Sequence, residues 1–571
     1  MSEASAAANP SSLSSARWAR RPPLASGAVI AHVISLVVAL PVLLCITRTQ
    51  WFFFDEWDFL TNRGFAGTSL QLFTPHNEHW STIPILVYRA LFSLFGLRTY
   101  TAYLVPLFLA HIVLAHLLWR VMLRLGVNTW LATGLSAVFL FLGAGWENLI
   151  WAFQIGFVGA TTLGVWAMLL NDREELTWRR QVSIWAVLIA ALMCSGIGVT
   201  MVAVTALVTL FRRGLRAAIL TISIPAAAYV LWLAVAGRRG FGSIPVTSDS
   251  FLRIPTYLWT GLTAAVEGLT GFAGAGSILI LGIVAWLFWL RHDSNANALV
   301  FAGCIGAVGF LIVNAVGRGA LGSTEAAAPR YAYTTIALLL PGIAATLDLI
   351  ARRDRLAQFA ALALVGFFGC QGLAQLWTQA RVNHVLRDQS KRQILAAADY
   401  LTQGLPVISK QPDPVLAPNL TVDELRELSA RGDLPAEAGG SATDMLSARA
   451  ALLTTLEAHP RYALGSSALE GVAGAVLSTG ANSCVELQSV GGAPMSFRLN
   501  VGRPSSISME SPLQETIQYF LQPGDGDEKI ANPLSLQMPA GKVMYLNIDD
   551  SNVHPFIVVP PGGLQVCGVN H

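Results

Sequence analysis

The sequence is poor in charge. Of its 571 residues, 12% are charged and 54% are hydrophobic, whereas an average globular protein has roughly 25% charged residues. The shortage is uneven. Up to about residue 380, apolar runs long enough to cross a bilayer alternate with short polar loops, and after that the composition is ordinary. We therefore predict an integral membrane domain followed by a soluble domain.

The sequence also has few lysines and a small net charge. The four lysines all lie after residue 390, and the net charge is only +3, which gives no reason to expect a nucleic-acid partner. No cleavable signal peptide is evident. Residues 1–26 are small, polar and basic, so we expect a disordered cytoplasmic tail before an uncleaved first span.

Eleven apolar segments are candidate membrane spans. They are residues 28–47, 101–119, 130–145, 150–170, 183–196, 197–211, 216–236, 276–290, 297–316, 332–350 and 357–377. With the N-terminus inside, the arginine-rich short loops fall on the inner side, as the positive-inside rule expects. The odd count places the C-terminal domain outside. This topology requires a break near Cys194–Gly198, because one helix over 183–211 would invert every later loop.

Cysteine is also rare, with six residues in the chain. Four of them, Cys45, Cys194, Cys304 and Cys370, lie in or near the predicted spans, where they are expected to be ordinary buried residues. Only Cys484 and Cys567 lie in the soluble part. Because an outside compartment permits disulfides, we predict a bond between these two. The loop that it closes is worth roughly 4 kcal/mol in the chain-entropy model.

The soluble part changes its pattern along the chain. Its first portion is helical, whereas later runs such as Ser496–Val501 and Val543–Ile548 alternate with period two between Gly and Pro turns, which predicts a small β-sandwich. The fold class is thus an all-α polytopic membrane domain followed by an extracytoplasmic α+β domain. The predicted parts are the tail 1–26, the transmembrane domain 27–380 with its first external loop 48–100, the helical region 381–470 and the β-rich domain 471–571.

Carboxylates gather just past the first span. The apolar run Val29–Ile46 leads into Trp51-Phe52-Phe53-Phe54-Asp55-Glu56-Trp57-Asp58. Acidic side chains at the mouth of a membrane domain are costly to desolvate, so they mark a functional site by default. The aromatic neighbours are placed to shield a carboxylate from water. Asp55, Glu56 and Asp58 are therefore the candidate catalytic residues.

Other polar residues fall on the same predicted outer side and are candidate substrate-binding residues. They are His76, Glu78, His79, Glu147, Gln154, Arg238, Arg239, Arg318, Arg330 and Tyr331. Outward arginines oppose the charge bias and suit an anionic group such as phosphate. Pairing with local carboxylates or lipid headgroups is the alternative.

The two histidines leave the question of metal open. Their spacing is not the His-Glu-x-x-His of zinc sites, so metal ligation, substrate contact and a structural role all remain in consideration. No residue is assigned as a metal ligand, although a divalent cation is an option as cofactor.

The Asp55-Glu56 pair lies directly after the first span, in a long first external loop of a polytopic chain. In this it resembles the GT-C glycosyltransferases, among them the protein O-mannosyltransferases and the aminoarabinose lipid A transferases. The mycobacterial arabinofuranosyltransferases have an acidic pair in a similar place, together with outward carbohydrate-binding domains. Pro329-Arg330-Tyr331 resembles an Arg-Tyr that opens a late span in bacterial relatives. The likeness covers the membrane part in outline.

The resemblance implies a bacterial plasma-membrane enzyme of cell wall biosynthesis. It would move a sugar from a polyprenyl-phosphate donor to a hydroxyl of a glycan, lipid or protein, with inversion at the sugar carbon. Asp55 aligns with the family's catalytic aspartate and would take the acceptor proton. Glu56 or Asp58 would orient the acceptor or hold a divalent ion, and the outer arginines would stabilise the lipid phosphate as it leaves.

Two other functions compete with this one. A transporter or flippase of lipid-linked saccharides would need polar groups near mid-membrane and two related halves with broken helices. Asn314 and the break at Ser195–Gly198 fit, but no second half repeats them. A non-catalytic envelope assembly protein that presents its β-domain leaves the acidic loop unexplained.

Overall fold

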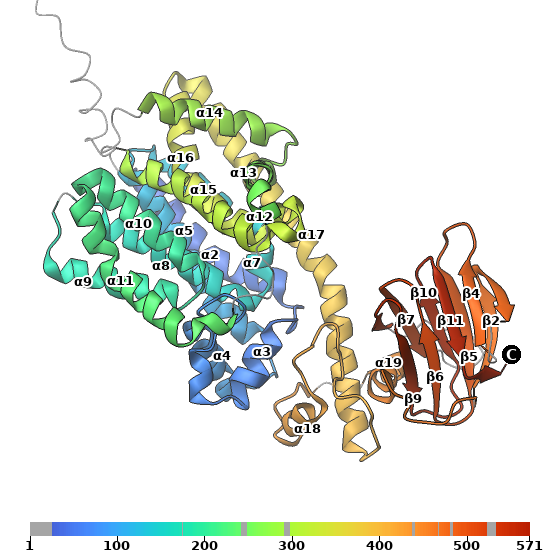
Figure 1. Ribbon diagram of the computed structural model, residues 1–571. Helices are drawn as coiled ribbons and strands as arrows, with labels where there is room; N and C mark the ends of the chain where they lie inside the picture. The colour runs from blue at the N-terminus through green and yellow to red at the C-terminus, as the bar shows by residue number, and fades with distance from the viewer. Residues whose placement is uncertain are drawn as a thin grey trace, which may run out of the picture. The chain divides into compact units, whose positions relative to one another are not determined.

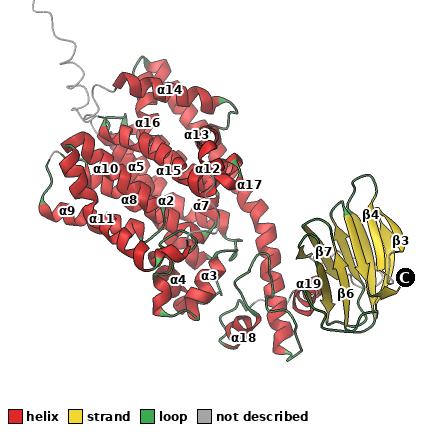
Figure 2. Cartoon of the chain, in the orientation of Figure 1, coloured by secondary structure: helices red, strands yellow, loops and turns green. Residues whose placement is uncertain are grey.

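The computed structural model describes residues 25–173, 175–240, 248–290, 297–436, 440–465, 467–479, 484–521 and 533–570, so the predicted tail lies almost wholly outside the described residues. The chain divides into two compact units (Figure 1). The first comprises Met1–Gln50, Gly67–Leu91 and Tyr100–Asn383, and the second Trp51–Ala66, Phe92–Thr99 and His384–His571. The long strands are all in the second unit, as the yellow arrows of Figure 2 show for the described residues.

The first unit is helical. Its helices are α2 (Ser26–Thr47), most of α4 (Thr82–Phe95), α5 (Thr101–Arg124), α6 (Thr129–Leu140), α7 (Glu147–Ile150), α8 (Ile155–Asn171), α9 (Trp178–Leu192), α10 (Ile197–Arg213), α11 (Leu215–Val235), α12 (Ser248–Leu252), α13 (Ile254–Thr270), α14 (Ala275–Leu290), α15 (Ala298–Arg318), α16 (Pro329–Ala351) and the start of α17 (Arg355–Thr402). Each of the eleven predicted spans coincides with one of them. The all-α prediction for this part is confirmed.

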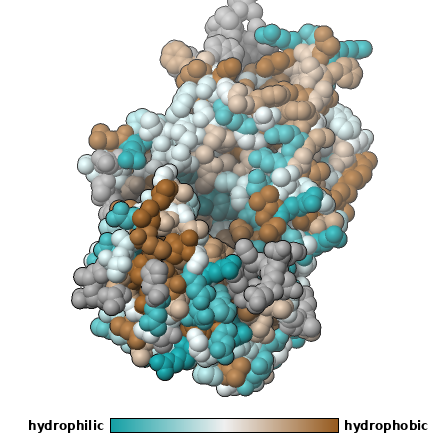
Figure 3. Space-filling model, turned by 90° about the vertical axis from the view of Figure 1, so that its right-hand side faces the viewer, coloured by the Kyte–Doolittle hydropathy of each residue, from teal (hydrophilic) through white to brown (hydrophobic). Residues whose placement is uncertain are grey.

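Seven of the described helices are long and apolar enough to cross a membrane, or eight if the bent pair α13–α14 is one span. Their outward faces carry large apolar side chains. Examples are Ile34 and Val37 on α2 and Val230 and Leu231 on α11, all of which are more than half exposed. Brown and tan atoms likewise cover much of the upper part of Figure 3. Such faces are stable in hydrocarbon rather than in water.

The predicted break near Cys194–Gly198 is confirmed, because α9 ends at Leu192 and α10 begins at Ile197. The turn is tight: a Cβ built on Gly198 would lie 2.6 Å from the carbonyl group of Ala191. Only glycine allows so close an approach of the two backbones. The sequence expectation missed α13, which meets α14 at an angle of 110°.

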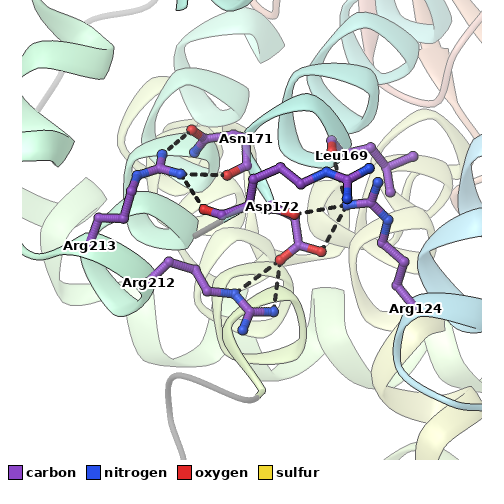
Figure 4. A network of polar contacts seen from close by, with 7 residues as sticks. Arg124, Leu169, Asn171, Asp172, Arg212 and Arg213 are labelled. Atoms are coloured by element: carbon purple, nitrogen blue, oxygen red, sulfur yellow. Dashed lines mark hydrogen bonds and ion pairs between the residues drawn. The ribbon is translucent and has the colours of Figure 1, made fainter. Parts of the chain in front are cut away.

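An aspartate whose side chain is only 7% exposed connects the ends of three helices (Figure 4). The Asp172 carboxylate, which follows α8, accepts hydrogen bonds from Arg124 of α5 at 2.9 Å and from Arg212 of α10 at 2.8 and 3.0 Å. The neighbouring Arg213 donates to the backbone carbonyls of Asn171 and Arg173. Buried charges need such partners. The charge of these arginines therefore holds the ends of helices together.

The second unit contains the end of α17, the helices α3 (Glu56–Leu60), α18 (Val422–Ala430) and α19 (Ala442–Leu453), and a two-sheet sandwich. One sheet has the order β1-β9-β6-β11-β4-β3 and the other β12-β2-β5-β10-β7-β8. The strands are β1 (Thr454–Glu457), β2 (Ser467–Ala473), β3 (Ala475–Thr479), β4 (Cys484–Ser489), β5 (Met495–Val501), β6 (Ser505–Glu510), β7 (Glu515–Leu521), β8 (Leu534–Met538), β9 (Val543–Ile548), β10 (Pro555–Val559), β11 (Gly563–Cys567) and β12 (Val569–Asn570).

Alternation builds the core of this sandwich. In β5 and β7 every second side chain is buried, among them Phe497, Leu499, Ile517 and Tyr519, and these pack into one cluster between the sheets. The period-two pattern that predicted a β-sandwich therefore also accounts for which side chains face inward. The predicted disulfide is confirmed: Cys484 of β4 lies directly opposite Cys567 of β11 and is bonded to it.

Candidate active site

The acidic loop begins with an unusual backbone conformation. Phe54, the residue before Asp55, has a φ of +52°, in the left-handed region that bulky side chains rarely adopt. Its N–H donates a hydrogen bond of 2.8 Å to the carbonyl of Leu416. Strain of this kind persists only where the surroundings hold it, and it is common at functional sites. Asp55 follows as the N-cap residue of α3.

The three candidate carboxylates have different surroundings. Glu56 is fully buried, and its Oε2 accepts a hydrogen bond of 2.9 Å from the N–H of Phe53. Asp58 pairs with Arg63 at 2.6 Å and also accepts from Asn62. Asp55 remains partly exposed to solvent. Glu56 is therefore the fully buried acid of the three, whereas Asp55 and Asp58 both remain partly exposed.

The aromatic residues around these acids also differ in their exposure to solvent. Phe52 and Trp57 are fully buried and form part of the packing of the second unit, whereas Phe54 is 44% exposed. The buried rings therefore anchor the loop in the core of the second unit. Only Phe54 presents an open aromatic face next to Asp55, where a sugar or a lipid chain can contact it.

The segment His76–His79 forms a tight turn in the first unit. The backbones of His76 and His79 exchange two hydrogen bonds, of 3.0 and 2.9 Å, with Asn77 in the left-handed region at φ +50°. The Nδ1 of His79 accepts a hydrogen bond of 3.2 Å from the N–H of Gly196, in the turn between α9 and α10. Among the described residues, no three His, Cys, Asp or Glu side chains are grouped as a metal site requires.

Two of the outer arginines are ion-paired. Arg318 donates to Glu78 at 2.9 Å, across 240 residues of sequence. Arg330 donates to Glu147 at 2.9 Å and to Glu325 at 3.2 Å, and its guanidinium lies 5.0 Å from the centre of the Tyr331 ring. Pairing with local carboxylates, the alternative that the sequence left open, thus applies to both.

The other two arginines differ. Arg238 and Arg239 lie on the short helix η5 (Gly237–Gly240), and both are exposed. Neither forms an ion pair within the part of the chain that the structure describes. These two guanidinium groups are therefore more accessible to an anion than those of Arg318 and Arg330.

Sequence reasoning missed three residues of this region. Glu325 is the second carboxylate on Arg330. The Tyr257 hydroxyl and the Asn148 amide are fully buried, and no polar group among the described residues bonds either one. Buried polar groups normally find partners. Glu325 lies only five residues before Arg330, so the sequence alone could have suggested this ion pair. Tyr257 lies on helix α13, which the sequence analysis did not predict. Gln154, a predicted binding residue, is likewise buried, and its Oε1 has no such partner.

The structure thus brings together Glu78 with Arg318, and Glu147 with Arg330 and Tyr331, all in the first unit. It brings Asp55, Glu56 and Asp58 together in the second. The catalytic and binding roles of these residues stay predictions.

Comparison with known proteins adds little. No family model matches the chain, and no curated protein matches it. The crystal structure of ArnT from Cupriavidus metallidurans, bound to undecaprenyl phosphate, is similar at 13% sequence identity, with a TM-score of 0.45 over 76% of this chain and 93% of that chain. A likeness this loose establishes neither a family nor an activity.

Proposed function

We propose that the chain is a membrane glycosyltransferase of GT-C type. It would move a sugar from a polyprenyl-phosphate donor to a hydroxyl of a glycan, lipid or protein on the outer face of the membrane. The carrying observation is the acidic loop: it follows a membrane-spanning helix, and in it the partly exposed Asp55 comes directly after the left-handed Phe54. A carboxylate that is accessible and held on a constrained backbone is what a general base requires.

The proposed reaction is a single displacement. The acceptor oxygen attacks the anomeric carbon of the donor while its proton passes to the Asp55 carboxylate. The bond between that carbon and the phosphate oxygen breaks, and its electron pair leaves with the lipid phosphate. Attack opposite the leaving group inverts the sugar carbon. Asp55 would recover by releasing the proton to water.

The leaving phosphate needs positive charge. Arg238 and Arg239, exposed and free of ion pairs in the described chain, are the first candidates to meet it. Arg318 and Arg330 would hold Glu78 and Glu147 in place, and those carboxylates would accept hydrogen bonds from sugar hydroxyls. The exposed ring of Phe54 would pack against the apolar face of the sugar.

The test compares Asp55 with an exposed aspartate outside the acidic loop. Membranes that contain the chain receive synthetic polyprenyl-phosphate donors with radiolabelled mannose, glucose or arabinose, and label in the envelope fraction is measured. Asp55→Asn should lower the initial rate by about 10²-fold or more, the usual contribution of a general base. Asp423→Asn, which removes an exposed carboxylate outside the acidic loop, should retain activity close to that of wild type. An Asp55→Asn protein as active as wild type would contradict the base assignment.

One observation favours a second candidate, a transporter of lipid-linked saccharides. The pair α13–α14 is bent by 110°, and broken helices are common in transporters. A transporter would move the labelled donor across the membrane of sealed vesicles without forming a glycosidic bond. Recovery of the label only as intact donor on the other side would therefore favour this candidate over the enzyme.

A further inference from the structure

The acidic loop shares its compact unit with a segment more than 300 residues away. That segment runs from Arg387 to Asp433, and three of its cations lie over aromatic rings of the first external loop. Arg387 lies 5.0 Å from the ring centre of Phe53, and Lys391 lies 5.1 Å from that of Trp51. Arg431 lies 5.5 Å from the ring of Phe65. These rings flank Asp55 in the sequence on both sides.

The backbone of the loop depends on the same segment. The left-handed Phe54 donates its N–H to the carbonyl of Leu416 at 2.8 Å. Further along, the hydroxyl of Thr61 donates to the carbonyl of Asn419 at 3.0 Å. Without these two acceptors, little would offset the strain at Phe54, and the loop would relax toward an ordinary backbone conformation.

The position of Leu416 is itself fixed from α17. The buried carboxylate of Asp413 accepts hydrogen bonds from the N–H of Leu416 at 2.9 Å and from the hydroxyl of Ser390 at 2.6 Å. Ser390 lies on α17 three residues after Arg387 and next to Lys391, so the three share one helix face. A continuous path of contacts therefore runs from this face through Asp413 and Leu416 to Phe54, the neighbour of Asp55.

We propose that this face of α17 is part of the catalytic apparatus, with Arg387 as a positioning residue for Asp55. The inference rests on the proposed function, because it assigns the loop's order a catalytic purpose. A base must lie within hydrogen-bond reach of the proton that it takes, and a displacement of about 1 Å can cost about 10²-fold in rate. Arg387 is only 2% exposed and lies against Phe53, two residues from the acid, so it acts through the loop rather than on the substrate.

The test uses the full chain in detergent or nanodiscs, with Arg387→Gln, Arg387→Lys and a matched control. The control is Arg426→Gln, because Arg426 belongs to the same segment but is about half exposed and pairs with Asp423. Hydrogen exchange of residues 51–66 reports on the order of the loop. The rate of sugar transfer at saturating donor and the half-saturating donor concentration report on catalysis.

Arg387→Gln should speed exchange at Phe54 and Asp55 by about tenfold or more and lower the saturated rate by a similar factor, with the half-saturating concentration nearly unchanged. Arg387→Lys should restore part of the slow exchange and part of the saturated rate, because a cation next to the Phe53 ring is retained. Arg426→Gln should match wild type. A second pair avoids any change at Arg387. Phe54→Gly should exceed Phe54→Ala in rate, because both lose the ring but only glycine adopts the left-handed backbone without strain.

Unchanged exchange in Arg387→Gln would overturn the ordering role. Faster exchange with an unchanged rate would overturn the catalytic role. If the wild-type protein transfers no sugar from any donor, the proposed function fails and takes the catalytic part of this inference with it. The exchange comparison does not depend on activity and would still decide whether α17 orders the loop.

Discussion

At the scale of single residues, the second unit contains an aspartate whose titration can be observed. Burial raises the pKa of the Asp413 carboxyl, although hydrogen bonds from Leu416, Ser390 and Val415 act in the opposite direction. The folded chain therefore keeps this proton to a higher pH than the unfolded chain does. Its stabilising contribution is complete at low pH and is lost as the pH rises from about 3.9, the ordinary value, through the raised one.

This predicts a pH-dependent difference between wild type and Asp413→Asn. The asparagine stays neutral, so the free energy of unfolding of wild type minus that of the variant should fall as the pH rises above about 4. Scanning calorimetry of the full chain in detergent at several pH values measures it, with Asp423→Asn as the control for loss of an exposed carboxylate. A difference that grows with pH would contradict the direction. Asp413→Ala should cost about 1–3 kcal/mol, because three donors lose their acceptor.

Some residues of the candidate site could be predicted from the sequence, but their interaction partners could not. The position of Asp55 directly after an apolar run marks it without any structure. That Glu56 is buried and Asp55 is not follows from the turn at Phe54, whose left-handed backbone no local pattern signals. The Arg318–Glu78 pair joins residues 240 apart in sequence, and only the packing of helices brings them together.

At the scale of secondary structure, the turn between α9 and α10 depends on a close backbone approach at Gly198. A Cβ on Gly198 would lie 2.6 Å from backbone atoms of Ala191, which have no freedom to move aside. Gly198→Ala should therefore destabilise the chain by about 1–3 kcal/mol, the usual cost of overpacking. It should also disturb the Gly196 N–H bond to His79.

The matched control is Gly309→Ala in α15. Nothing lies within 4 Å of the Cβ that it would add, so stability should stay the same or rise slightly, since alanine is the better helix former. Thermal unfolding in one detergent compares the two variants. Equal midpoints for Gly198→Ala and Gly309→Ala would show that the turn tolerates a wider separation than its geometry indicates.

Elements with a strong periodic signal were predicted, and those with a mixed composition were not. Long apolar runs predicted the spanning helices, and alternation predicted the strands. The bond between Cys484 and Cys567 was predicted because they are the only two cysteines of the soluble part. Helix α13 escaped because Glu267 and several threonines and glycines dilute its apolar character. Its sharp angle to α14 arises at Gly271 and Gly274, both with positive φ, where the chain turns without crossing the membrane again or crosses it as a broken span.

At the scale of the whole molecule, α13 and α14 decide on which side of the membrane the C-terminal unit lies. The span criterion gives eight crossings when the bent pair counts as one, but the shorter helices α6, α9 and α10 also coincide with predicted spans. If these three cross as well, the count is eleven, and an inner N-terminus places the sandwich outside. If each helix crossed separately, the count would be even and the sandwich would lie inside. The disulfide favours the outside, because the cytoplasm keeps thiols reduced.

Cysteine labelling in intact cells tests this parity. In a chain with Cys45→Ala and Cys370→Ala, Ser478→Cys adds a thiol on the exposed strand β3, and Arg179→Cys adds one at the start of α9, in a predicted inner loop. A membrane-impermeant maleimide should label the first in intact cells and the second only after permeabilisation. If Ser478→Cys is also protected until permeabilisation, the sandwich is cytoplasmic. The acidic loop, which folds with residues 384–433 of the same unit, could then not meet a donor on the outer leaflet.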